Sequence, residues 1–83
     1  MMKLKTENGK LYFGDKEVLK GWESFSGWYW FATELNSDKV HFGLVQGHAT
    51  ELGYFSEREL NSLYPRVWEI NEIDLPHAGR REE

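Results

Sequence analysis

Apolar and polar side chains alternate with a period of two at the start of the chain, which is the pattern of a half-buried strand. Between residues 2 and 7, Met, Leu and Thr occupy the even positions and charged residues the odd ones. Asn8-Gly9 follows, the dipeptide best suited to a two-residue hairpin turn, and Gly14-Asp15 is a second turn signal. The pattern predicts a short β-meander with strands over 2–7, 11–13 and 17–19.

The strongest strand signal lies at residues 28–35, Trp-Tyr-Trp-Phe-Ala-Thr-Glu-Leu. Its first half is apolar at every position, which predicts a central strand covered on both faces. A four-residue loop at 36–39 would lead into a partner strand over 40–45. The loop length predicts a register whose facing pairs are Leu35 with Val40, Glu34 with His41, Thr33 with Phe42, Ala32 with Gly43, and Phe31 with Leu44.

A single helix is predicted over residues 57–64. Ser56 and Glu59 have capping-box spacing, and Phe55 and Leu60 have the spacing of a hydrophobic staple. Leu60, Leu63 and Tyr64 would form its apolar stripe, and Pro65 would end it.

The remaining segments complete an α+β fold. Residues 51–55 and 67–71 are typical of strands, the second extended irregularly through Ile73 and Leu75. Residues 20–27 form a predicted connector, pinned to the core by Trp22 and Phe25. We therefore expect one domain over 1–83 with a frayed tail at 77–83. Its fold would be a mostly antiparallel sheet of about five or six strands with one short helix.

Composition narrows the class of protein. The 83 residues include thirteen aromatic ones and no cysteine, so neither a disulfide framework nor a thiolate zinc site is available. No apolar run reaches the roughly 20 residues of a membrane helix, and early lysines interrupt any signal peptide. We expect a soluble, cytoplasmic protein with no membrane partner.

Charge argues against nucleic acid as a partner. Residues 21–79 contain three basic residues against nine acidic ones, whereas residues 1–20 carry a local charge of +2. Binding to phosphates requires clustered Lys and Arg, which this body of the chain lacks. No nucleic-acid partner is therefore expected.

Part of the chain resembles a family catalogued as domain of unknown function twenty-nine fifty-eight. The likeness runs from Trp28 to about Leu75 and includes Thr33-Glu34-Leu35, Phe42-Gly43-Leu44, and the block Glu51-Leu52-Gly53-Tyr54-Phe55-Ser56 followed by Glu59-Leu60. Members are small proteins encoded mainly by bacterial chromosomes, plasmids and phages. The resemblance implies an accessory or mobile-element context, and it implies no activity, cofactor or catalytic residue.

Surplus aromatic side chains favour a non-enzymatic protein-interaction domain. Four Trp are hard to bury completely in so small a domain, and exposed Trp residues are frequent binding hot spots. The candidate binding residues are Trp22, Trp28, Trp30, Trp68 and His48. We expect a protein partner, and a monomer or weak dimer.

Two other functions remain as alternatives, although no cofactor is expected. The first is a divalent-cation-binding protein of the calcium type, with oxygen ligands from Asp38, Glu51, Glu57 and Glu59. The second is a small hydrolase with His41 or His48 as general base. The facing pair of Glu34 and His41 fits a carboxylate-oriented base, but we interpret it as an ordinary cross-strand hydrogen bond. No nucleophile or oxyanion donor is identified by spacing, so no catalytic residue is assigned.

Overall fold

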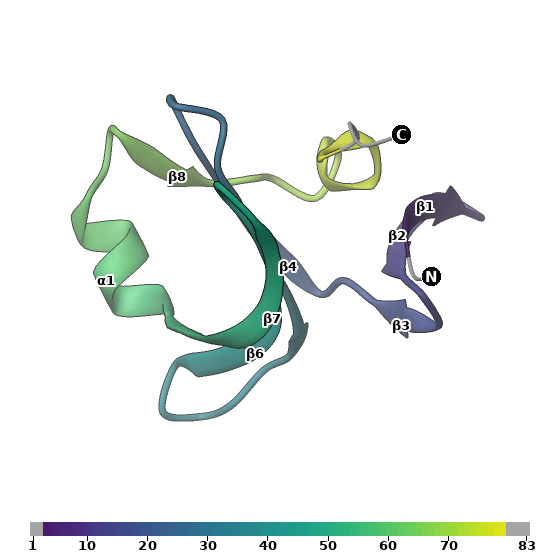
Figure 1. Ribbon diagram of the computed structural model, residues 1–83, viewed down its shortest axis with the longest axis horizontal. Helices are drawn as coiled ribbons and strands as arrows, with labels where there is room; N and C mark the ends of the chain where they lie inside the picture. Colours follow the sequence, from purple (N-terminus) through teal and green to yellow (C-terminus); the bar gives the residue numbers. More distant parts are fainter. Residues whose placement is uncertain (1–2, 80–83) are drawn as a thin grey trace.

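The chain forms two antiparallel sheets in the computed structural model, which describes residues 3–79. The smaller sheet has the order β1-β2-β3 and the larger has the order β7-β6-β5-β4-β8. The elements are β1 (Leu4–Glu7), β2 (Lys10–Phe13), β3 (Lys16–Glu17), β4 (Lys20–Ser24), β5 (Tyr29–Glu34), β6 (Val40–Gln46), β7 (Thr50–Ser56), α1 (Glu57–Ser62), β8 (Val67–Glu69) and the 3-10 helix η1 (Leu75–His77). The α+β class is confirmed, with the meander as a separate sheet (Figure 1).

The meander forms where the turn signals predicted it. Asn8 and Gly9 both have positive φ, 53° and 77°, as a type I′ turn requires. The third strand is shorter than expected because the chain changes partners there. The Val18 amide still donates to the Leu11 carbonyl, but the Leu19 amide donates to Ala32 in the large sheet.

The predicted connector at 20–27 is wrong, because residues 20–24 form β4. This strand lies between β5 and β8 and pairs with both. Gly21 weakens the strand pattern in the sequence, because glycine is a poor strand former. The fold nevertheless requires glycine at this position, since an added Cβ would lie only 2.8 Å from Leu75 Cδ1. Trp22 is fully buried as expected, whereas Phe25 is 72% exposed and does not anchor the chain to the core.

The strand at the centre of the large sheet is β5, as predicted, but its register with β6 changes midway. Phe31 faces Leu44 and Ala32 faces Gly43, as expected. A bulge between Ala32 and Glu34 then places Glu34 opposite Phe42. The expected Glu34–His41 and Thr33–Phe42 pairs are therefore wrong, as is the Leu35–Val40 pair beyond them, because a bulge adds one residue to one strand.

The helix α1 begins as its capping signal predicts. The Ser56 side chain accepts a hydrogen bond from the Glu59 amide at 3.1 Å. The helix ends at Ser62 rather than at residue 64, ahead of the cis Tyr64–Pro65 peptide. Of its expected apolar stripe only Leu60 is buried, because Leu63 and Tyr64 follow the last helical turn and are exposed.

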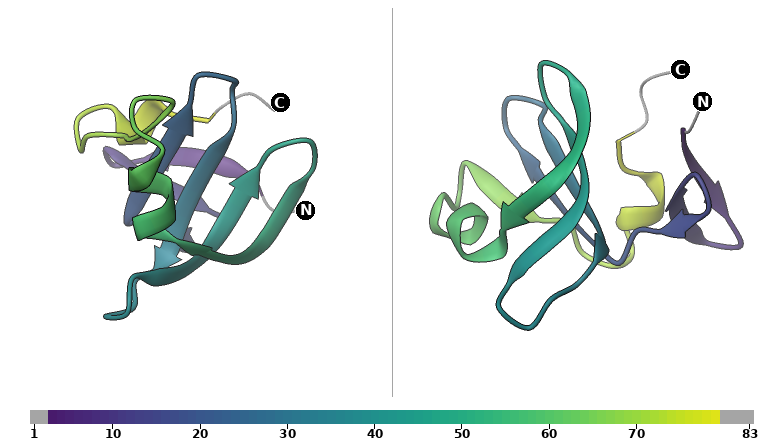
Figure 2. Two further views of the ribbon diagram at one scale, coloured as in Figure 1. Left: turned by 90° about the vertical axis from the view of Figure 1, so that its left-hand side faces the viewer. Right: turned by 60° about the horizontal axis from the view of Figure 1, so that its bottom comes forward.

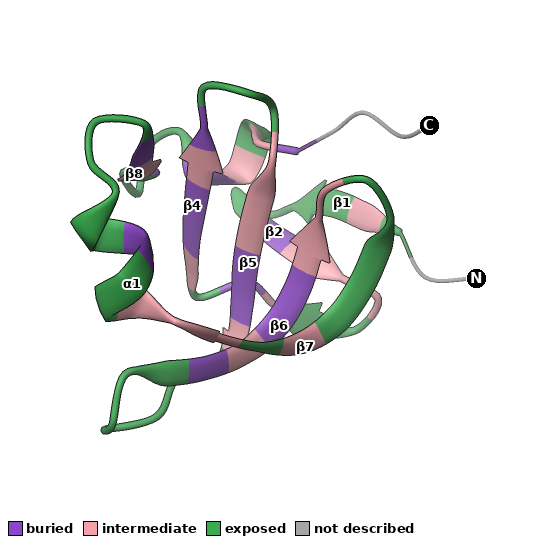
Figure 3. Ribbon diagram, turned by 60° about the vertical axis from the view of Figure 1, so that its left-hand side comes forward, coloured by how far each residue is buried: buried purple, intermediate pink, exposed green. Residues whose placement is uncertain are grey.

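The large sheet is the middle of three layers (Figure 2). α1 lies on one face, over a cluster of Trp22, Ala32, Leu60 and Val67. The meander and η1 lie on the other face, over a cluster of Leu11, Val18, Phe31, Leu44, Ile70 and Leu75. Figure 3 shows that α1 leaves much of its own face of β5, β6 and β7 uncovered.

The segment after β8 is not a strand extension. Leu75 starts η1 and is buried, and Gly79 is buried beside the Phe31 ring. Residues 77–79, where the expected tail begins, thus complete η1 and reach the core, and residues 80–83 lie outside the described residues. None of the described helices is long and apolar enough to cross a membrane.

Candidate functional site

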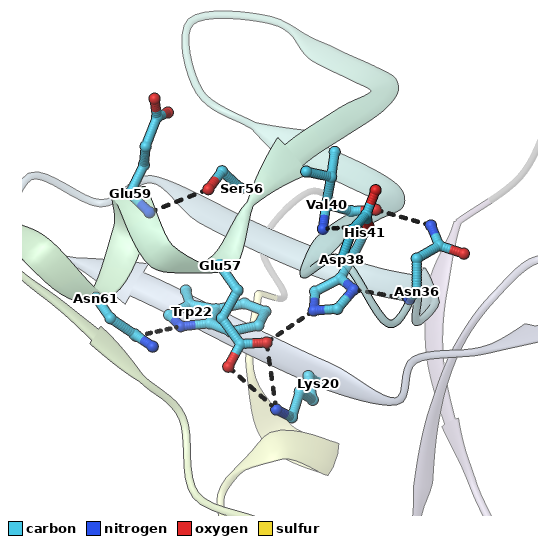
Figure 4. A network of polar contacts seen from close by, with 10 residues as sticks. All are labelled: Lys20, Trp22, Asn36, Asp38, Val40, His41, Ser56, Glu57, Glu59 and Asn61. Atoms are coloured by element: carbon cyan, nitrogen blue, oxygen red, sulfur yellow. Dashed lines mark hydrogen bonds and ion pairs between the residues drawn. The ribbon is translucent and has the colours of Figure 1, made fainter.

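A partly buried polar network joins β4, β6 and α1 on the helix side of the sheet (Figure 4). His41 Nε2 lies 2.7 Å from Glu57 Oε1, and Lys20 Nζ lies 3.4 Å from both Glu57 carboxylate oxygens. Trp22 stacks beside His41 with ring centroids 6.3 Å apart, and its indole N–H donates to Asn61 Oδ1 at 3.0 Å. The network ties the first and last turns of α1 to the sheet.

The contacts of His41 determine its tautomer and argue for a structural role. Its Nδ1 accepts the Asn36 backbone N–H at 3.0 Å, so the neutral ring carries its proton on Nε2 and donates it to Glu57. A general base needs a free lone pair within reach of a substrate. His41 is 2% exposed, and both of its nitrogens are already in use.

The carboxylate of Glu57 is held in its charged form by this network. The hydrogen bond from His41 lowers the pKa of Glu57 below its ordinary value of 4.5, and Lys20 lowers it further. Burial acts in the opposite direction and is outweighed. The helix N-terminus is also a favourable place for a carboxylate, because the first amides of a helix carry partial positive charge.

A second candidate site is an apolar groove of about 370 Å³ beside the network. Three segments line it: the turn between β4 and β5, the start of β5, and the chain after α1. Its lining residues are Ser24, Phe25, Ser26, Trp28, Trp30, Leu63, Arg66 and Val67. Such a concave surface, mostly apolar with a few polar groups, is typical of a binding site. We call it the aromatic groove.

Backbone and side-chain hydrogen bonds hold the walls of the aromatic groove. The Phe25 amide donates to the Arg66 carbonyl at 3.0 Å and so joins the two walls. Within the turn, Ser24 Oγ accepts the Trp28 amide at 3.1 Å, and the Gly27 amide donates to the Ser24 carbonyl. Gly27 has a φ of 91°, which glycine adopts without strain. The groove is therefore formed before any ligand arrives.

The structure brings together three of the five predicted binding residues. The rings of Trp28 and Trp30 lie 5.9 Å apart, and His48 contacts Trp28 edge-on at 5.4 Å. Trp22 is 0% exposed and belongs to the core, so it offers no binding surface. Trp68 lines a separate hollow with Glu23 and Tyr29, and it lies away from the aromatic groove.

The four predicted cation ligands are dispersed. Asp38 Oδ1 accepts the Val40 amide in a turn, and Glu57 belongs to the His41 network. Glu51 lies on β7, and Glu59 on the exposed side of α1. Within residues 3–79, no three His, Cys, Asp or Glu side chains are grouped as a metal site requires.

Sequence reasoning missed Phe25, Leu63 and Arg66 as groove residues. The aromatic character of Phe25 favours the core, but its position between Ser24 and Ser26, in a segment bounded by glycines, is also typical of an exposed loop. Leu63 and Arg66 carry no signal of their own, because only the fold places the chain after α1 beside the β4–β5 turn.

No protein-family model, curated protein or solved structure significantly matches this chain.

Proposed function

We propose that this protein is a non-enzymatic interaction domain that binds a segment of a partner protein in the aromatic groove. The observation that carries the proposal is the exposure of Phe25, 72%, at the mouth of a preformed groove lined by two Trp side chains. An aromatic side chain so exposed gains buried area on binding, and aromatic anchors dominate the energy of many interfaces. The hydrogen-bonded walls reduce the entropy lost when the partner binds.

The chemistry of the groove also indicates what the partner segment contains. Aromatic and aliphatic side chains line most of it, and Arg66 is the one charged residue among those lining it. Arginine pairs with carboxylates in a bidentate geometry. The proposed ligand is therefore a peptide segment with an apolar anchor followed or preceded by an acidic residue. An accessory role, as the family resemblance implies, is compatible with such a ligand.

A selection from a displayed peptide library tests the proposal without knowledge of the natural partner. Selected peptides should combine an aromatic or aliphatic residue with an acidic one. In the amide spectrum they should shift the indole N–H signals of Trp28 and Trp30 and leave that of Trp68 unchanged. Phe25→Ala should weaken peptide binding at least tenfold, since a hot-spot aromatic contributes about 2 kcal/mol or more.

The matched control is Ile73→Ala, which removes an apolar side chain that is 83% exposed and does not line the groove. It should leave peptide binding unchanged. Peptides that shift only Trp68, or a selection that enriches no sequence, would contradict the proposal.

A further inference from the structure

The strand β7 is a long, unprotected edge of the large sheet. Its seven residues, Thr50–Ser56, pair with β6, and within residues 3–79 no strand pairs with its outer side. The opposite edge is β8, which has only three residues. Short edge strands limit unwanted pairing, whereas a long edge with apolar side chains is a template for another strand.

The hydrogen bonds at the two ends of the β6–β7 ladder show which backbone groups of β7 point outward. The Glu57 amide donates to Lys39, and the Gly47 amide donates to Ala49. Because bonded and non-bonded pairs alternate in an antiparallel ladder, the bonded pairs between these ends are His41–Phe55, Gly43–Gly53 and Val45–Glu51. The backbone N–H and C=O groups of the other β7 residues, Thr50, Leu52, Tyr54 and Ser56, therefore face away from β6.

The same outward-facing residues carry the exposed apolar side chains of this edge. Leu52 is 52% exposed and Tyr54 is 69% exposed, although Tyr54 contacts the Phe42 ring on the neighbouring strand at 5.0 Å. Glu51 is the one charged residue of β7. The edge thus lacks the lysines and prolines with which natural sheets discourage pairing.

We propose that β7 pairs with the β7 strand of a second copy of this chain, antiparallel and about a twofold axis at Gly53. This register places Leu52 opposite Tyr54 of the other copy, and Thr50 opposite Ser56, so every outward-facing residue meets an outward-facing residue. Leu52 and Tyr54 then form fully hydrogen-bonded pairs. Ser56 contributes only its N–H, which donates to the Thr50 carbonyl, because the Ser56 carbonyl accepts the first hydrogen bond of α1. The two sheets then join into one continuous ten-stranded sheet, twice the five strands of one copy.

Charge and side-chain size favour this register over its neighbours. Glu51 faces Phe55 of the other copy, whereas a register centred on Glu51 would oppose two carboxylates, which is destabilising. Registers centred on Leu52 or Tyr54 leave one outward-facing residue of each copy without a counterpart. At the axis, Gly53 faces Gly53, and the lack of side chains allows the backbones to approach closely. An isologous contact of this kind closes as a dimer and does not propagate.

Sedimentation equilibrium over micromolar to millimolar protein tests the proposal. The mass should rise with concentration from 9.8 kDa toward twice that value. In parallel, hydrogen exchange of the Leu52 and Tyr54 amides should slow at least tenfold at the high concentration. A mass that stays at 9.8 kDa, with unchanged exchange at these two amides, would overturn the proposal.

Two charge variants test the register itself. Leu52→Lys alone and Tyr54→Glu alone should each remain monomeric, because each places a charge opposite an apolar residue of the other copy. An equimolar mixture should recover the dimer, because the introduced lysine and glutamate face each other only in the register centred on Gly53. Failure of the mixture to dimerise, while the unmodified chain does, would refute this register.

Controls separate pairing from folding and from the aromatic groove. Ile73→Lys adds the same charge at an exposed position outside β7 and should dimerise like the unmodified chain. Leu52→Pro removes an outward-facing N–H, which an edge strand tolerates, and should abolish the dimer while the amide spectrum stays folded. Dimerisation that survives Leu52→Pro but is lost with Phe25→Ala would assign the contact to the groove and overturn the proposal.

Discussion

At the scale of single residues, His41 shows how a polar side chain can be buried when both of its ring nitrogens have partners. His41 satisfies both ring nitrogens, one with a backbone amide and one with Glu57. A buried polar group without a partner costs about 1–3 kcal/mol. This explains why a histidine is tolerated among the largest fully buried side chains of the protein.

Glu57→Gln should reduce the free energy of unfolding by about 2 kcal/mol at neutral pH, because hydrogen bonds to a charged group are stronger than neutral ones. The difference in the free energy of unfolding between Glu57→Gln and the unmodified protein should shrink as the pH falls. The folded-state pKa of Glu57 is lowered, so its stabilisation is fully present above the ordinary value of 4.5 and disappears as the pH falls through the folded-state pKa. Urea unfolding of both proteins across this acidic range measures the difference.

The matched control for Glu57 is Glu59→Gln, which removes the same charge from the same turn of α1. The Glu59 carboxylate is exposed and takes no part in the His41 network. Its replacement should change the free energy of unfolding by less than about 0.5 kcal/mol. Equal losses in the two variants would show that the helix dipole, and not the network, stabilises this turn.

At the scale of elements, the sheet depends on a close approach between β5 and β6. Gly43 and Gly53 face each other across β6 and β7, yet their surroundings differ. A Cβ at Gly43 would lie 1.8 Å from the Phe31 carbonyl oxygen, whereas a Cβ at Gly53 would meet nothing within 4 Å. The bulge after Ala32 lies beside Gly43 and bends the two strands there.

Gly43→Ala should therefore destabilise the protein by about 3 kcal/mol, because the backbone of β5 must move to admit the methyl group. Gly53→Ala is the control and should change the free energy of unfolding by less than about 0.5 kcal/mol. Urea denaturation at micromolar concentration compares the two. If the two variants lost similar amounts of stability, the backbone preference of glycine, and not the contact with Phe31, would be the cause of the destabilisation.

Sequence patterns predicted most elements of this fold, and the failures have identifiable causes. Asn8-Gly9 and Ser56 act through neighbours in sequence, so the hairpin and the helix start were both correct. The strand β4 was missed because Gly21 and Ser24 are poor strand formers in isolation. Its pairing with β5 and β8 outweighs that local preference.

At the scale of the whole molecule, the two ends of the described chain meet. The Thr6 hydroxyl on β1 donates to the Pro76 carbonyl in η1. Leu75 joins the same hydrophobic cluster as Leu11 and Val18. The meander and η1 together cover one face of the large sheet (Figure 2), so neither is an appendage.

Leu75→Ala should cost about 3 kcal/mol in the free energy of unfolding, since it removes a buried side chain and leaves a cavity between η1 and the sheet. Leu75 is 9% exposed and Ile73, two residues earlier, is 83% exposed. Ile73→Ala should therefore be nearly neutral. Thermal and urea unfolding of both variants measure these changes in stability. If Leu75→Ala left the free energy of unfolding unchanged, η1 would not be part of the core.

The candidate site could be predicted only in part. Of the five candidate binding residues, Trp28, Trp30 and His48 lie together in the structure, and their role in binding stays a prediction. An excess of aromatic residues could not distinguish them from Trp22, which is buried, because a residue count does not show which side chains the fold covers. Exposure is a property of what covers a side chain, and the covering segments come from elsewhere in the chain.

By itself, the sequence determined what depends on neighbouring residues: the turns, the helix cap, the central strand and the α+β class. Only the tertiary structure decided the partner of His41, the exposure of Phe25 and the free edge at β7. A one-residue bulge moves Glu34 away from His41, and α1 brings Glu57 to it instead; no local pattern encodes either change. Contacts between distant segments depend on packing, so they become visible only once the chain is folded.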